Sequence, residues 1–375
     1  MSSPSYPVIW DNWSENDSLQ ILRHNGIAAK LKGTALVVLR ALCGTFWRLP
    51  MSCLIDVDFK TKEDLPFATR GYTDLWKRDW NGGKVAVKAL RFGPDDDRSM
   101  ITKRFAKEVV ILKWLRHENV VPLVGVISEP PFFSMVSAWM MNGNIMSFIT
   151  ANPDQNPFNL ASILVDATAG LKYLHEHDAV HGDLRGANIL INSGHRACLA
   201  NLELFAIIEE TISANEYGGN TMRSTIRWTA PEILSPETYG YAGSDACIKL
   251  PSKSTDIYAL GMTMFEVISG CEPFEDTKPD GLLIRKVLNK IRPERPSVGF
   301  SDALWALLIQ TWLEVFEAAD SAPSARPNIT DVLELLQDEG ETWSQTRRLL
   351  GFSSPMEQEP SGMSAVSPEL AMRLT

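Results

Sequence analysis

The sequence has few cysteines, no long uninterrupted apolar run and no excess of positive charge. Its five cysteines are odd in number and none lies in a CxxC pair, which argues against disulfides and a structural zinc site. The most apolar early run, residues 33–47, is interrupted by Arg40 and is shorter than the roughly 20 residues that cross a bilayer. The net charge of −10 argues against a nucleic-acid surface. We therefore expect a cytoplasmic protein with no nucleic-acid partner and no membrane association.

Two terminal segments flank the main body of the chain. Residues 1–61 are assigned to an N-terminal extension, in which apolar residues recur at helical spacing: Leu31, Ala35, Val38, Leu42 and Phe46. This amphipathic segment fits a helix on a membrane surface or a helix that docks on the main domain, and we favour the second interpretation. Residues 339–375 are predicted to be largely disordered, because the end of the chain is rich in Ser, Pro and Met.

The main body, residues 62–338, is predicted to be an α+β fold of two lobes. A small β-rich lobe, 62–141, contains a hairpin turn at residues 81–83 and a helix over about 99–116. A larger helical lobe, 142–338, begins with an apolar helical stripe. Its further expected elements are a hairpin pairing 188–191 with 197–200, an exposed loop over 235–252, and helices near 255–269, 301–315 and 328–337.

A lysine and a glutamate form the first candidate site. Lys88 ends the segment Val-Ala-Val-Lys on a predicted strand, where a lysine is by itself ordinary solvated surface. Glu108 lies on the apolar stripe of the following helix, between Phe105 and Leu112. A carboxylate that points into a core needs a partner, so we predict a Lys88–Glu108 ion pair.

A second candidate site lies in residues 180–191, VHGDLRGANILI. Asp183 and Asn188 stand just before a short apolar strand, with Arg185 between them. An Asp on a tight loop flanked by glycines is, taken alone, an ordinary turn residue. Phosphoryl transfer needs a carboxylate to accept a hydroxyl proton, a metal ligand, and cations on the phosphates. Together with Lys88, this segment supplies those residue types.

Five motifs stand in the order and at the intervals of one family. They are VAVK (85–88), KEVVILKWLRHENVVPLVGV (107–126), HGDLRGAN (181–188), IRWTAPE (226–232) and DIYALGMTMFEV (256–267). With these motifs the chain resembles a eukaryotic protein kinase domain of the tyrosine-kinase-like group over about residues 62–338. LRGAN and RWTAPE are closer to the tyrosine-kinase style, but this group contains both Ser/Thr and Tyr specificities.

The resemblance implies a catalytic role for four residues. Lys88 would hold the α- and β-phosphates of ATP, and Glu108 would orient Lys88. Asp183 would be the catalytic base and Arg185 a contact to the γ-phosphate. The resemblance also implies cofactor-binding residues for ATP and Mg²⁺, namely Lys88, Leu75, Ala86, the gatekeeper Ser137, the hinge residues Ala138 and Met140, and the magnesium ligands Asn188 and Asn201.

Two structural roles follow from the same resemblance. Glu232 of the APE motif would pair with Arg326 and lock the activation segment to the helical lobe. Asp256 would brace the catalytic loop from the helix beneath it.

The metal-binding motif departs from the family pattern. Residues 201–203 read Asn-Leu-Glu where the family has Asp-Phe-Gly, at the family's interval from Asn188. Magnesium favours carboxylate oxygens, so the neutral amide of Asn201 should bind it more weakly. Glu203 restricts a backbone that glycine leaves free, and its carboxylate would either repel phosphate or offer a displaced metal ligand.

Two further motifs depart from the pattern. The three glycine positions of the phosphate loop hold Ala68, Arg70 and Thr73, whose β-carbons hinder close approach of the backbone to phosphate. Arg70 is interpreted as a surface residue, with a phosphate contact or occupation of the nucleotide site as alternatives. Gly182 replaces the Arg that reads an activation-loop phosphate, so control by such a phosphate should be weak.

The sequence thus supports two functions for one kinase-like domain. The favoured hypothesis is a pseudokinase, in which phosphoryl transfer to protein Ser, Thr or Tyr is weak or lost and the domain serves as a signalling scaffold or allosteric partner. The alternative is an active atypical kinase that transfers the ATP γ-phosphate to a protein hydroxyl. Either function implies a protein substrate or signalling partner, with ATP weakly bound and Mg²⁺ in doubt.

Overall fold

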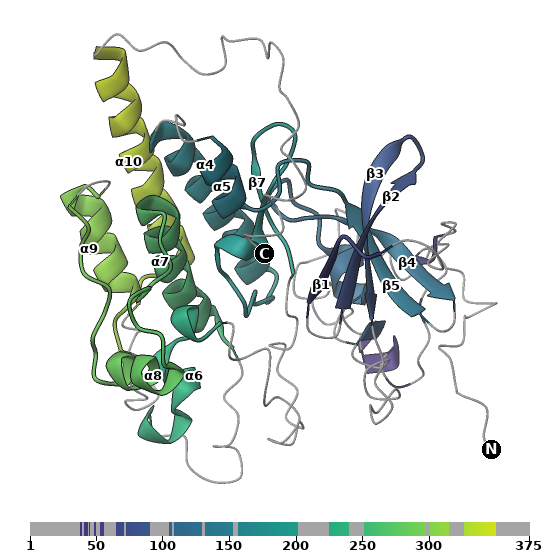
Figure 1. Ribbon diagram of the computed structural model, residues 1–375, viewed down its shortest axis with the longest axis horizontal. Coiled ribbons are helices and arrows are strands. Elements are labelled where there is room, and N and C mark those ends of the chain that lie inside the picture. Colours follow the sequence, from purple (N-terminus) through teal and green to yellow (C-terminus); the bar gives the residue numbers. More distant parts are fainter. Residues whose placement is uncertain are drawn as a thin grey trace. The chain divides into compact units, whose positions relative to one another are not determined.

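The computed structural model describes residues 38–39, 41–43, 45, 49, 53–55, 65–70, 73–90, 105–106, 109–129, 132–152, 157–201, 225–239, 251–297, 300–314 and 326–349. The chain divides into two compact units, Met1–Trp139 and Met140–Thr375 (Figure 1). The first is built on a sheet and the second mostly on helices, which confirms the predicted α+β, two-lobed fold class.

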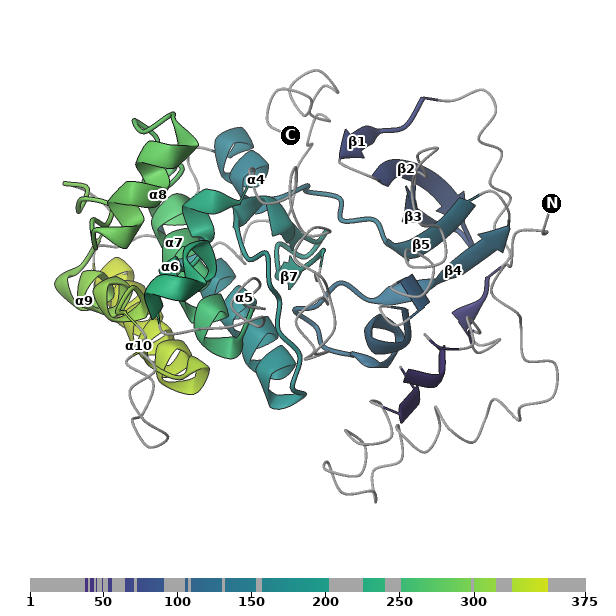
Figure 2. The same ribbon diagram turned by 90° about the horizontal axis from the view of Figure 1, so that it is seen from below.

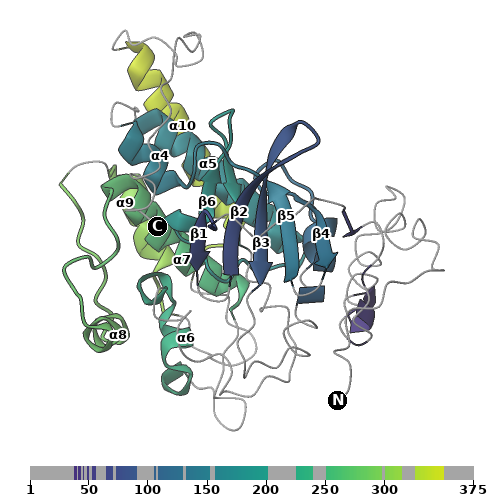
Figure 3. The same ribbon diagram turned by 45° about the vertical axis from the view of Figure 1, so that its right-hand side comes forward.

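The first unit contains a five-stranded antiparallel sheet with the order β1-β2-β3-β5-β4 (Figure 3). Its strands are β1 (Ala68–Arg70), β2 (Thr73–Trp80), β3 (Gly83–Leu90), β4 (Leu123–Glu129) and β5 (Phe132–Ala138). The predicted turn joins β2 to β3. Asn81 and Gly82 have φ values of 47° and 77°, the left-handed conformation that a two-residue hairpin loop requires at both positions.

The two faces of this sheet differ because neighbours along a strand point to opposite faces. One face forms a buried core of Trp76, Val85, Val87, Ala89, Ile127 and Val136. On β3, Ala86 and Lys88 alternate with these core residues and therefore lie on the other face. The register pairs Lys88 with Leu75 of β2 and Ala86 with Ser137 of β5. The sheet thus gathers Leu75, Ala86, Lys88 and Ser137 on one face.

The helix predicted over about 99–116 is confirmed for the residues that the structure describes. Residues 105–106 and 109–114 are helical, and Phe105, Val109 and Val110 are buried. Glu108 and Glu203 lie outside the described residues, so the Lys88–Glu108 ion pair stays a prediction.

The described residues of the second unit form a helical assembly with one small hairpin (Figures 1 and 2). Its α-helices are α4 (Ile145–Ala151), α5 (Pro157–Glu176), α6 (Pro231–Leu234), α7 (Lys253–Ser269), α8 (Asp280–Leu288), α9 (Asp302–Thr311) and α10 (Ile329–Leu349). The hairpin consists of β6 (Ile189–Ile191) and β7 (Ala197–Leu199). Short 3₁₀ turns cover Gly186–Asn188, Ile226–Trp228 and Pro236–Tyr239. The hairpin and the helices near 255–269 and 301–315 were predicted and are confirmed.

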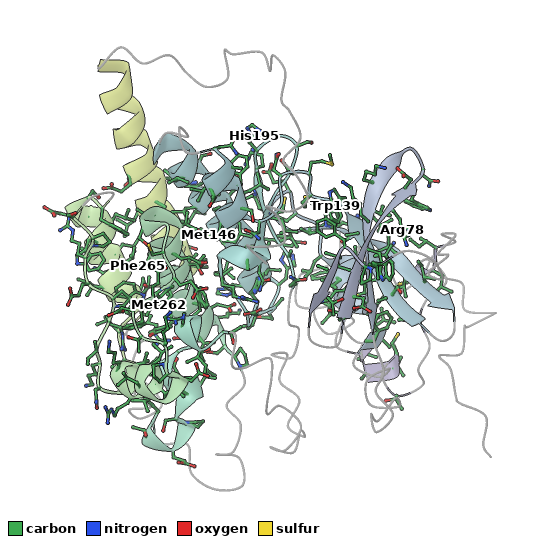
Figure 4. All side chains as sticks on the ribbon, in the orientation of Figure 1. Arg78, Trp139, Met146, His195, Met262 and Phe265 are labelled. Carbon is green, nitrogen blue, oxygen red and sulfur yellow. The ribbon has the colours of Figure 1, made fainter. Side chains whose placement is uncertain are left out.

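Helix α7 is buried along most of its length, and Figure 4 labels Met262 and Phe265 among its side chains. Ser252 and Thr255 form a capping box at its start, so the first backbone donors of a buried helix are satisfied. This helix carries Asp256 in its first turn and Glu266 near its end. Both carboxylates accept hydrogen bonds from the backbone of the loop that carries Asp183.

The structure differs from two expectations about elements. The helix expected to end near 337 continues to Leu349, and it still lies close to α5 at Gly340, where a β-carbon would be 4.0 Å from that of Ala161. Ser301 also donates a hydrogen bond to Glu339 over 2.8 Å. An exposed loop was expected over 235–252. This expectation was wrong at Tyr239, which is buried and donates a hydrogen bond to Glu314. Among the described residues, no helix is long and apolar enough to cross a membrane.

Candidate active site

The loop that carries Asp183 enters the β6–β7 hairpin through the 3₁₀ turn that ends at Asn188. The backbone N–H of Ala200 donates to the carbonyl of Asn188 over 2.9 Å. The hairpin therefore returns the chain to the start of β6. This brings Asn201 beside Asn188, although the two residues are separated by a whole strand pair in the sequence.

Asn201, Asn188 and Asp183 form a chain of side-chain hydrogen bonds. Asn201 Nδ2 donates to Asn188 Oδ1 over 2.9 Å. Asn188 Nδ2 in turn donates to Asp183 Oδ2 over 2.6 Å and to the Asp183 carbonyl over 2.7 Å. Asn201 has a φ of 53°, a left-handed conformation that Asn tolerates better than most residues. The side-chain oxygen of the fully buried Asn188 is thus occupied by an amide donor.

Asp183 keeps one carboxylate oxygen outside this chain. Within the described residues, Asp183 Oδ1 is buried and accepts no hydrogen bond, and Arg185 Nε lies 3.3 Å from it. The Arg185 guanidinium also lies 5.9 Å from the ring centre of Trp228. A carboxylate oxygen in this position is available to a hydroxyl proton, and the nearby guanidinium limits the cost of burying the carboxylate.

The predicted brace between Asp256 and the catalytic loop is confirmed. Asp256 Oδ2 accepts from the backbone N–H of His181 over 2.8 Å, and Oδ1 accepts from that of Gly182 over 3.0 Å. His175 Nε2 lies 2.9 Å from the same carboxylate. Burial lowers the pKa of His181, so this imidazole is held neutral, and its Nδ1 accepts from the Asp183 N–H over 3.3 Å.

Glu266 is a second brace, which the sequence analysis did not identify. Its Oε2 accepts from the Gly186 N–H over 2.8 Å and from Trp228 Nε1 over 3.0 Å. One carboxylate thereby joins the catalytic loop to the 226–232 segment. Burial raises the pKa of Glu266 to about 7. The position of Glu266 inside the apolar run of α7 was the available signal, because a carboxylate that points into a core needs a partner, as for Glu108.

The space beside Glu266 explains the glycine at position 186. A β-carbon there would lie 2.8 Å from Met146 Cγ and 2.9 Å from Glu266 Oε1, and Met146 is labelled in Figure 4. Only a residue without a side chain lets the loop lie this close to both α4 and α7.

The predicted ion pair between Glu232 and Arg326 is confirmed. Arg326 Nη1 and Nη2 donate to the two carboxylate oxygens over 2.7 and 2.9 Å, and both side chains are almost fully buried. Arg326 also donates to the Ser254 carbonyl over 2.9 Å and lies over the ring of Tyr258 at 5.0 Å. This bidentate pair fixes the 226–232 segment to the start of α7.

In the first unit, the predicted hinge continues from β5 beyond Ser137. Ala138 pairs with Val85, and the N–H of Trp139 donates to the Lys84 carbonyl over 3.1 Å. Phe67 contacts the ring of Trp139 edge-on at 5.0 Å, and Lys77 Nζ lies 4.7 Å from its centre (Figure 4). The hinge strand is therefore held to β3 by its backbone and to β2 through an aromatic side chain. Met140, also predicted at the hinge, begins the second unit, and its carbonyl accepts from Gly143 over 3.3 Å.

The predicted magnesium ligands, Asn188 and Asn201, do not suit Mg²⁺ in this arrangement. Magnesium requires oxygen ligands in near-octahedral geometry and is usually held through carboxylates. Here both predicted ligands are neutral amides, and the side-chain oxygen of Asn188 already accepts from Asn201. The described residues contain no group of three or more His, Cys, Asp or Glu side chains placed to hold a metal ion. The hydrogen-bond chain satisfies these groups without a cation.

Comparisons with known proteins agree with the motifs and the fold. The family model "Protein tyrosine and serine/threonine kinase" matches residues 69–336. Serine/threonine-protein kinase STY46 of Arabidopsis thaliana is 26% identical over 275 residues, which are 72% of this chain and 43% of that protein. Serine/threonine/tyrosine-protein kinase HT1 of the same plant is 24% identical over 278 residues, covering 72% and 64% of the two chains.

A third relative is named as a suppressor. "Kinase suppressor of Ras A" of Caenorhabditis elegans is 26% identical over 285 residues, which cover 74% of this chain and 36% of that protein. The chain spans less than two thirds of the length of each of these three relatives. The motifs, the fold and the match over residues 69–336 together place this chain in the protein kinase family.

Proposed function

We propose that this kinase domain is a pseudokinase of the tyrosine-kinase-like group, in which phosphoryl transfer is weak or lost. In this role the domain binds protein partners as a signalling scaffold or allosteric regulator. The observation that carries the proposal is the hydrogen bond from Asn201 Nδ2 to Asn188 Oδ1. Through this hydrogen bond, the two predicted metal ligands contact each other directly instead of through a cation.

The charges at this position explain why the substitution matters. An aspartate at 201 and the amide oxygen of Asn188 would face each other as two acceptors, and a cation between them would relieve the repulsion. An asparagine at 201 supplies an N–H donor instead, so the pair is satisfied without metal. Binding magnesium would then require breaking this bond and turning at least one amide, for a ligand set without the carboxylate that Mg²⁺ favours.

The proposal includes a nucleotide site, but not a metal ion in that site. Leu75, Ala86, Lys88 and Ser137 share the face of the sheet that is free of the apolar core. Small residues at 86 and 137 leave room for a flat base, and Lys88 offers a positive charge to phosphate. We propose that ATP binds weakly to this face without a requirement for a divalent cation.

The alternative, an active atypical kinase, is favoured by one observation. Asp183 Oδ1 accepts no hydrogen bond within the described residues and lies beside Arg185. A buried carboxylate oxygen that accepts no hydrogen bond is suited to accept a hydroxyl proton, which is the task of a general base.

Transfer of radiolabelled phosphate from ATP separates the two functions. The purified protein is incubated with ATP and either Mg²⁺ or Mn²⁺, and Asp183→Ala serves as the control for a contaminating kinase. The proposal predicts label at the level of the Asp183→Ala protein with both metals. Label that depends on Asp183 would establish the active kinase instead.

A further inference from the structure

A short piece of the N-terminal extension lies against the edge strand of the sheet. The sheet ends at β4, whose inner side pairs with β5. On its outer side, Leu54 forms a parallel bridge with Val126, and the Ile55 N–H donates to the Val126 carbonyl over 3.0 Å. Figures 2 and 3 show this piece, in purple, beyond β4. An edge strand presents unpaired backbone groups, and here this chain covers them itself.

The β4 strand is shaped to receive this piece at Gly125. A β-carbon on Gly125 would lie 2.5 Å from Ile55 Cγ2, 3.1 Å from Ile55 Cγ1 and 3.0 Å from the Cys53 carbonyl. The first of these separations is shorter than any ordinary contact between carbon atoms. The register of β4 also shifts between Leu123 and Gly125, which places the glycine at an irregularity in the strand. The backbone thus leaves a notch that Ile55 fills.

Burial extends along the described residues of the extension on the N-terminal side of this contact. Leu39, Cys43, Leu49 and Cys53 are all almost fully buried, and residues 41–43 are helical. Ile55 packs against the core cluster that contains Val85, Val87 and Ala89 of β3. Those three residues alternate along β3 with Ala86 and Lys88, which lie on the opposite face. Ile55 of the docked piece therefore packs against the core on the face of β3 opposite to Lys88.

We propose that the outer edge of β4 is a docking site whose occupant is the N-terminal extension of the same chain, bound through residues 53–55. The notch at Gly125 receives Ile55, the Val126 carbonyl fixes the register, and the buried apolar residues hold the segment in place. The domain that works as a unit accordingly includes this segment, which begins well before the region matched by the family model. Loss of the segment would expose the β4 edge and loosen β3 beneath Lys88.

Thiol labelling of the full chain tests the docking directly. Cys43 and Cys53 are buried in the docked segment, Cys271 is exposed in the second unit, and Cys198 is buried there. Burial raises the pKa of Cys43 to about 12, which suppresses the reactive thiolate. In the native protein, a maleimide should therefore label the exposed Cys271 faster than the buried Cys43, Cys53 and Cys198, as measured by peptide mass spectrometry.

Gly125→Ala is the variant that should release the segment. The added β-carbon collides with Ile55, so Cys43 and Cys53 should be labelled at least about tenfold faster while Cys198 stays protected. Gly281→Ala is the matched control, since a β-carbon at Gly281 in α8 meets nothing within 4 Å. Ile55→Ala removes both colliding carbons, so adding Gly125→Ala to it should change the labelling rates by much less than in the native background.

Two results would overturn the proposal. One is unchanged protection of Cys43 and Cys53 in Gly125→Ala. The other is an equal effect of Gly125→Ala in the native and the Ile55→Ala backgrounds, which would show that the glycine does not act through Ile55. Neither measurement uses nucleotide or metal, so the outcome is independent of the function proposed above.

Discussion

The side-chain amide of Asn201 donates a hydrogen bond to the side-chain oxygen of Asn188 over 2.9 Å. The side-chain amide of Asn188 in turn donates a hydrogen bond to the carboxylate of Asp183. The three residues that the kinase resemblance assigns to metal binding and catalysis are therefore joined directly, with donors and acceptors matched. An arrangement of this kind stabilises the loop structure and leaves a cation nothing to neutralise between residues 188 and 201.

Removing the donor at position 201 should destabilise the protein. Asn201→Ala leaves the buried oxygen of Asn188 without its amide partner, at a cost of about 1–3 kcal/mol in the free energy of unfolding. Urea denaturation of the native protein and the variant measures this difference. An unchanged midpoint would show that the Asn201–Asn188 bond contributes nothing to the folded state.

Glu266 should make stability depend on pH near neutrality. Its pKa is about 7 in the folded protein and 4.5 ordinarily, so the folded state holds a proton that the unfolded state has released. The stability from this group is complete below about pH 4.5 and is lost as the pH rises through about 7, by at most about 3 kcal/mol. Glu266→Gln, which does not ionise, should therefore gain stability relative to the native protein as the pH rises from 5 to 8, by about 2.5 kcal/mol.

The other shifted group near this site does not disturb the comparison. His181 has a lowered pKa, so its contribution is lost as the pH falls below its ordinary value, opposite in direction to that of Glu266. The native protein and Glu266→Gln share His181, so its effect cancels in the difference between the two unfolding curves. A difference that stays constant from pH 5 to 8 would contradict the raised pKa of Glu266.

Gly182 is favoured by the backbone conformation of the catalytic loop. Its φ of 79° lies in the left-handed region, where a side chain costs roughly 1–2 kcal/mol. Gly182→Ala should lower the thermal midpoint, whereas Gly281→Ala, at an exposed position of α8, should leave it unchanged or raise it slightly. Equal effects of the two changes would mean that the loop relaxes around residue 182.

The Glu232–Arg326 pair should be among the costliest contacts to break. Glu232→Gln removes one charge of a buried bidentate pair, with an expected loss of about 3–5 kcal/mol. Asp178→Asn is the matched control, because Asp178 pairs with Lys253 on the surface with its side chain 92% exposed, and such a pair contributes about 1 kcal/mol or less. Chemical denaturation of both variants should separate the two cases clearly.

The sequence predicted those features that depend on local pattern. The alternating pattern placed Lys88 on a strand, and the Asn-Gly turn predicted the hairpin before it; both are confirmed. The kinase resemblance placed Asp256 beneath the catalytic loop, and the structure bears this out. These features follow from periodicity, turn chemistry and motif spacing, which a single sequence displays.

Features that depend on contacts between distant segments could not be predicted in this way. The donor from Asn201 to Asn188 arises only when β6 and β7 pair, and Glu266 finds Gly186 and Trp228 only in the folded unit. The notch at Gly125 depends on a segment about 70 residues earlier in the chain. Tyr239 was expected in an exposed loop because its neighbours are small and polar, and its partner Glu314 lies far along the sequence.

The dependence of thermal stability on Mg²⁺ tests the central claim most directly. Unfolding midpoints are measured for the native protein and Asn201→Asp, with ATP present and with Mg²⁺ or a chelator added. We expect no shift with Mg²⁺ in the native protein and a shift to higher temperature in Asn201→Asp, whose carboxylate restores the favoured ligand. A Mg²⁺-dependent shift of the native protein as large as that of Asn201→Asp would contradict this claim.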